Sequence, residues 1–125
     1  MINIKPVIVA ALEGDAELLA LLGGPKVFHF DVSDNVPAPL ITYAELNNDP
    51  LAFGGEKELF SKITMAVKPW TDKNKSTSAI AAAVDRVITS IGGTREQAGD
   101  EDQLSRESKP MVYSFVVENE TGEIL

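Results

Sequence analysis

The sequence is poor in the residues that carry out most enzyme chemistry. It has no cysteine, which excludes disulfide bonds, thiolate metal sites and cysteine nucleophiles. It has one histidine, His29, and one tryptophan, Trp70. Basic residues are also scarce: 11 lysines and arginines against 19 acidic residues give a net charge of −8. Because lysine and arginine clusters recognise nucleic acids and anionic membranes, we expect neither sequence-specific nucleic-acid binding nor membrane binding.

Long hydrophobic runs are missing as well. The apolar stretch from Val7 to Leu12 is too short to span a membrane and leads to no cleavage site for a signal peptide. We therefore expect a soluble protein that is not exported. The length of 125 residues and the 44% hydrophobic content fit one domain with its own core. The prediction is a single domain over residues 1–125, in which 120–125 form a loose tail.

Three segments show the spacing of amphipathic helices. Asn3 is expected to cap a helix that ends at Gly14, and Asp15 a second helix that runs through Leu22. The longest helix is predicted from Ser76 or Thr77 to about Ile91. Its apolar residues are spaced for one helix face: Ile80, Val84, Val87, Ile88 and Ile91.

The remaining segments predict strands and loops. Strands are expected at 26–30, 40–46, 58–68 and 111–118, with a polar loop between 47 and 57. The strongly polar segment 94–107 is typical of an exposed hairpin or a mobile loop. The resulting order is α-α-β-β-β-α-β-β. It predicts an α+β fold in which helices pack on one face of a largely antiparallel sheet.

No reaction class is supported by the residues present. His29 has no legible nucleophile or orienting partner, and we expect it on the strand face opposite Phe28 and Phe30. Asp100, Glu101 and Asp102 lack the alternating spacing of a calcium loop. The glycine pairs begin no phosphate-binding pattern. We therefore expect no catalysis, no metal and no cofactor.

Trp70 has two interpretations. It follows Pro69 at the end of a predicted strand. Its large apolar indole would suit a core position under the third helix. It would equally suit an interface anchor at the rim of the domain, because tryptophan is enriched in protein contacts.

The succession of segments resembles a family of small phage proteins. Four stretches carry the resemblance: Asp15–Gly24 leading into Val27-Phe28, then Pro37–Tyr43, Ile63–Trp70 and Ser78–Val84. They are similar to the tail-completion, or tail-to-head joining, proteins of long-tailed bacteriophages and prophages. The tail terminators are a more distant likeness. The chain departs from the family at Leu40, where an aromatic residue often follows the second proline, and at 94–107, which has no clear counterpart.

The resemblance implies a structural virion protein without catalysis. Such a protein would be soluble in the bacterial cytoplasm before assembly. It would then form a homo-oligomeric ring, a hexamer, at the head-proximal end of the tail. Its partners would be the tail-tube protein and the head connector proteins. The alternative is a small non-catalytic α+β module that binds a ligand, although the predicted core positions lack convergent polar groups.

A tail-end ring would also have to let DNA pass. The densest acidic group, Glu96, Asp100, Glu101 and Asp102, lies in the segment expected to protrude. It either lines the channel, where it would repel phosphates, or faces solvent only.

Overall fold

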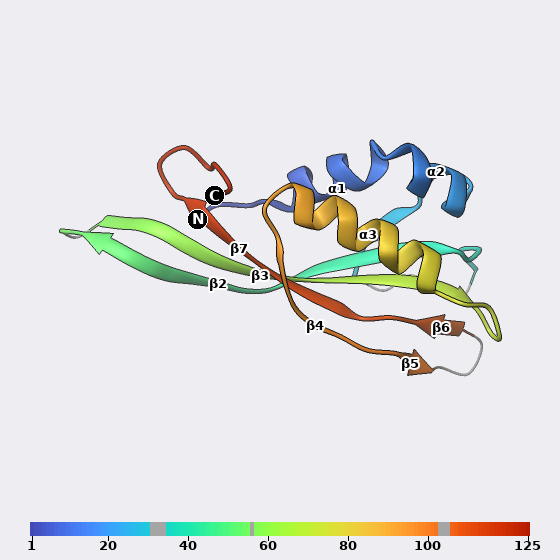
Figure 1. Ribbon diagram of the computed structural model, residues 1–125. Coiled ribbons are helices and arrows are strands. Elements are labelled where there is room, and N and C mark those ends of the chain that lie inside the picture. The colour runs from blue at the N-terminus through green and yellow to red at the C-terminus, as the bar shows by residue number, and fades with distance from the viewer. Residues whose placement is uncertain (31–34, 56, 103–105) are drawn as a thin grey trace.

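Three helices lie on one face of a seven-stranded sheet, across the residues that the structure describes (Figure 1). This computed structural model describes residues 1–30, 35–55, 57–102 and 106–125. Two helices come first, then three strands, a third helix and the remaining strands. The predicted α+β class and the order of its elements are confirmed.

The helices begin and end close to their predicted bounds, with α1 at Lys5–Glu13, α2 at Ala16–Leu22 and α3 at Ser78–Ser90. The Asp15 cap of α2 is confirmed, because its Oδ2 accepts a hydrogen bond from the backbone N–H of Leu18 at 3.1 Å. The capping residue of α1 is Ile4 instead of Asn3. Asn3 still contributes to the start of α1, since its Oδ1 accepts a hydrogen bond from the Lys5 N–H at 3.1 Å.

The strands are β1 (Val27–His29), β2 (Leu40–Gly54), β3 (Lys57–Asp72), β4 (Thr94–Ala98), β5 (Glu101–Asp102), β6 (Arg106–Ser108) and β7 (Met111–Glu118). The central strand is β3, which pairs antiparallel with β2 on one side and with β6 and β7 on the other. Outside these, β4 pairs with β7 and β5 with β6, both antiparallel. Among the described strands only β1 is parallel to its neighbour, β2. The sheet is largely antiparallel, as predicted.

The prediction of a loop at 47–57 is wrong. Strand β2 continues to Gly54 and pairs with β3 from Lys57 onward. Two bulges, between Glu45 and Asn47 and between Pro50 and Ala52, let a sequence rich in turn residues run on as a strand. Pro50 is tolerated because its side of β2 has no further strand to bond.

The far part of this hairpin projects beyond the helices and β7 (Figure 1). We call residues 49–60 the arm. Strand β7 backs β3 only from Phe60 onward, and β1 pairs with β2 only at residues 41–43. Most of the arm is therefore a two-stranded ribbon, a structure that is only marginally stable alone in water.

The polar segment 94–107 forms a hairpin, the first of its two predicted forms, with residues 103–105 outside the described part. Strands β4 and β5 run along β7 and β6, and the Gly99 N–H donates to the Pro110 carbonyl at 3.2 Å between them.

The segment 120–125, expected to be loose, folds back on β7. The Leu125 N–H donates to the Val116 carbonyl at 2.9 Å, and Ile124 packs partly buried against the core. Gly122, at φ 75°, allows the reversal of the chain.

The core lies between the helices and one face of the sheet. On β3 the odd-numbered residues point into it: Ile63, Met65 and Val67 are each 0% exposed. The same face of β7 and the inner face of α3 complete it with Met111, Tyr113, Phe115, Val117, Ile80, Val84, Val87 and Ile88. The predicted register of α3 is confirmed.

On α1 the apolar residue Val7 is 44% exposed. It sits at the rim of the stripe that Ile4, Ile8 and Leu12 form.

The side chain of Val84 is 0% exposed, so Val84→Asp would bury an unpaired carboxylate in this core. We expect a loss of more than about 3 kcal/mol of stability, enough to prevent folding of a marginally stable domain. Ala82→Asp on the exposed face of the same helix is the control and should melt close to the parent. Circular dichroism melts measure both; a soluble Val84→Asp protein with an unchanged melt would contradict the packing.

Candidate assembly surfaces

In the described part of the chain, one face of the sheet carries no helix (Figure 1). We call it the open face. It bears the even-numbered residues of β3 together with the residues paired with them on β2 and β7. Small and β-branched residues dominate its middle: Ala44, Thr64, Ala66, Val112, Ser114 and Val116.

Trp70 lies on the open face instead of under α3. Its side chain is 6% exposed, and the indole Nε1–H donates to Thr42 Oγ1 at 2.9 Å. Arg106 lies on the same face and donates from Nη2 to the Val36 carbonyl, which ties the segment before β2 across this end of the sheet. Trp70 is thus buried within the subunit, but outside the core under α3 that was the first of its two predicted positions. Its role at an interface stays a prediction.

The acidic residues singled out in the sequence follow the β4–β5 edge of the sheet. Glu96, on β4, accepts a hydrogen bond from Ser114 Oγ at 2.5 Å. Asp100 and Glu101 are exposed further along this edge. The backbone of Asp102 belongs to β5, while its side chain lies outside the described structure. Whether this edge meets DNA stays a prediction.

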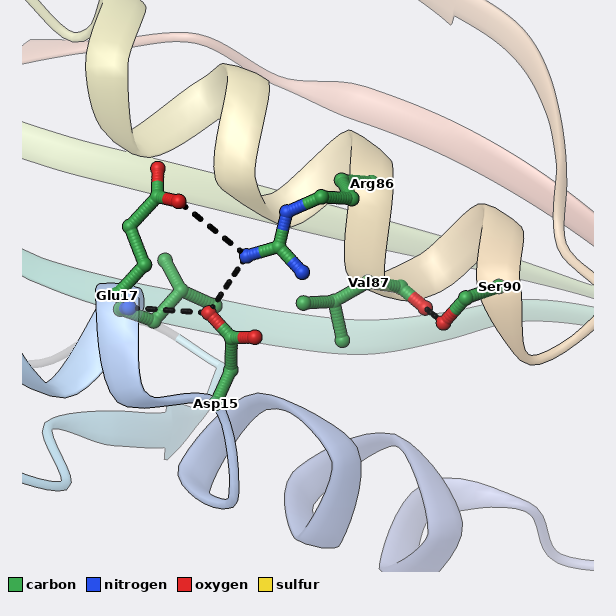
Figure 2. A network of polar contacts seen from close by, with 6 residues as sticks. Asp15, Glu17, Arg86, Val87 and Ser90 are labelled. Carbon is green, nitrogen blue, oxygen red and sulfur yellow. Dashed lines mark hydrogen bonds and ion pairs between the residues drawn. The ribbon is translucent and has the colours of Figure 1, made fainter.

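A polar cluster joins α2 to α3 (Figure 2). Arg86 Nη2 on α3 lies 2.8 Å from Asp15 Oδ2 and 3.5 Å from Glu17 Oε2. The hydrogen bond from Arg86 lowers the pKa of Asp15, and the same contact raises the pKa of Arg86. Because Asp15 and Arg86 are 71 positions apart, no local pattern in the sequence predicts the pair.

A second cluster joins α3 to the β4 edge. The Tyr113 hydroxyl donates to Asp85 Oδ1 at 2.7 Å, and Arg95 Nη1 lies 3.3 Å from the same oxygen. Burial raises the pKa of Tyr113, and the hydrogen bond to the carboxylate raises it further. The phenol therefore stays protonated at neutral pH, which suits a structural tie and not a general base.

The rest of the described structure adds no chemical centre. His29 is exposed, with its ring centroid 4.0 Å from that of Phe30 and 5.2 Å from that of Tyr43. The expected placement of His29 opposite both phenylalanines is therefore wrong for Phe30, whose φ of 60° breaks the strand alternation. Within the described ranges, no three histidine or carboxylate side chains are grouped to hold a metal ion. No helix there is long and apolar enough to cross a membrane.

Comparison with known proteins points to virion assembly. Residues 6–106 match the model of a family described as "Tail completion protein gp17". The chain belongs to this family. No individual curated protein matches it.

Membership of the tail completion family makes the chain a structural protein of a phage tail, active in virion assembly. The match covers the helical layer, strands β1 to β3 and the β4–β5 edge. It confirms the family to which the sequence was likened. Sequence reasoning missed the arm, the Arg86 cluster and the exposed Phe30, because each depends on residues brought together only by the fold.

The Asp15–Arg86 contact gives a stability test. Asp15→Ala removes both the cap of α2 and the ion pair, so the melting temperature should fall. The pKa of Asp15 is lowered from 3.8, so its stabilisation is complete above that pH and is lost as pH falls through the folded-state pKa.

The gap between the melting temperatures of parent and Asp15→Ala should thus be full above the unfolded-state pKa of 3.8 and close as pH falls below it. Glu17→Ala is the control, expected to change the melt less, since Glu17 is 58% exposed and its contact is longer. A gap independent of pH would contradict an ionised Asp15 in the contact.

Proposed function

We propose that the chain is a ring subunit that completes the head-proximal end of the tail and joins it to the head connector. Six copies would form the ring, with the tail-tube protein on one side and connector proteins on the other. The observation that carries the proposal is the family match over residues 6–106, which places the chain among tail completion proteins.

The shape of the subunit supports a ring. A closed ring needs two different, mutually complementary patches on each subunit. The chain offers unlike surfaces: the arm, the open face, the helical layer and the β4–β5 edge (Figure 1). The two sheet edges differ too, since one consists of β1 and the outer part of β2 and the other of β4 and β5.

The alternative, a small ligand-binding module, has less support. A ligand held between helices and sheet needs a cavity with convergent polar groups. In the described structure the space between the layers is filled by side chains such as Ile8, Leu18 and Met65, each 0% exposed. The surface hollow of about 620 Å³ between α3 and β4 is lined largely by charged and small residues, among them Asp85, Arg95 and Lys109.

We expect the isolated protein to be monomeric or weakly associated and to form a ring only on a tail end. The charge of −8 disfavours self-association, and both sheet edges are interrupted by bulges. Sedimentation velocity at micromolar concentration measures the free state. Electron microscopy of tails purified without this protein, before and after its addition, shows whether it caps them. A stable ring in the absence of tails would contradict the first expectation, and tails left uncapped the proposed function.

The acidic β4–β5 edge gives a test of DNA passage. If it approaches the channel, replacing Asp100, Glu101 and Asp102 with lysine should leave assembly intact but slow DNA ejection, because the new cations hold phosphates. Added salt should relieve the effect. The control reverses three other carboxylates, Glu13, Glu120 and Glu123, for the same change in net charge. Normal ejection of the first variant at low salt would remove this edge from the channel.

A further inference from the structure

The open face carries an apolar groove of about 280 Å³ beside the end of β1. Its floor is made of small residues, Ala44 and Ala66. Its walls are large apolar side chains left in solvent, since Phe30 is 60% and Leu46 52% exposed. Such a patch on a chain so acidic marks a contact surface.

Phe30 is held in an unfavourable conformation at this groove. Its φ of 60° lies in the left-handed region, which a bulky side chain rarely adopts. The backbone nevertheless holds it there, because the Phe30 N–H donates to the Tyr43 carbonyl at 2.9 Å. An exposed aromatic ring held in a strained conformation is typical of an interface anchor.

Lys68 gives the groove a charge. It lines the rim next to Ala66, and no described side chain forms an ion pair with it. The groove therefore suits an apolar side chain that has a carboxylate close by.

The arm carries that combination. Leu51 is 53% exposed and Asp49, two residues earlier, is exposed as well. In extended chain these two residues lie about 7 Å apart. The ribbon that bears them would gain stability from a surface to pack on.

We propose that the arm of one copy docks in the groove of a second copy, with Leu51 between Phe30 and Leu46 and Asp49 against Lys68. The occupant comes from another copy because Leu51 and Ala44 belong to one strand and, measured along the paired residues of β3, lie about 18 Å apart. The contact is head-to-tail, joining unlike patches, and so repeats from subunit to subunit until a ring closes. The inference rests on the proposed ring function and names the surfaces that form it.

The cysteine-free chain allows a clean crosslinking test. A Leu51→Cys, Ala44→Cys double variant is added to tails purified without this protein and then oxidised. We expect a ladder of disulfide-linked species up to the closed ring on a non-reducing gel. Either single variant alone should give no crosslink, and an equal mixture of the two single variants should give dimers only. The distance along β2 rules out a disulfide within one subunit.

Charge reversal tests the Asp49–Lys68 contact. Asp49→Lys and Lys68→Asp should each weaken assembly on tails by about tenfold, and the double reversal should restore it. A defect in folding of the arm would not be repaired in this way. Asp72→Lys, an exposed reversal on β3 away from the groove, is the control and should assemble as the parent does.

The two proposals fail differently. Tails that are capped by the parent while the double-cysteine variant gives no ladder would overturn the arm-to-groove contact alone. Crosslinking of a single variant to itself would also overturn it, because that requires a two-fold contact. If the parent leaves tails uncapped, the proposed function fails, and the crosslink is then read in concentrated free protein, where the absence of a ladder overturns the contact as well.

Discussion

Burial of one side of β3 is the constraint on which the rest of the molecule depends. This strand pairs with β2, β6 and β7, and its residues Ile63, Met65 and Val67 are fully buried beneath the helices. A sheet of this size needs a helical layer on at least one side to bury its apolar residues. The chain supplies only one such layer among the described residues, so the opposite face is left for other uses.

The composition of the open face suits a chain with a net charge of −8. The middle of the open face is made of small and β-branched residues, and the exposed apolar side chains of Phe30 and Leu46 line the groove. Bulges in β2 and β4 interrupt the edges where another strand would add. The net charge and the interrupted edges both disfavour association of free subunits.

Polar contacts also join the helices to one another and to the sheet. Arg86 ties α3 to the start of α2, and Asp85 connects α3 with Tyr113 and Arg95. The first cluster joins two helices, and the second joins α3 to the sheet. The tail completion family to which the chain belongs is likewise described by its place in the virion. The function is therefore read from surfaces and not from a catalytic centre.

Hydrophobic periodicity alone determined the α+β class and the inner face of α3, because burial imposes a period on helices and strands. The cap at Asp15 was also predictable from the sequence, since it satisfies a local backbone donor. Tertiary structure decided the rest. Strand β2 runs through residues typical of turns because pairing with β3 outweighs local preference. Trp70 lies opposite the helices because strand alternation from Met65 and Val67 puts it there, and Phe30 meets Leu46 only because β1 and β2 pair in parallel. Local patterns show which residues are buried, whereas the fold decides which distant residues pack against them.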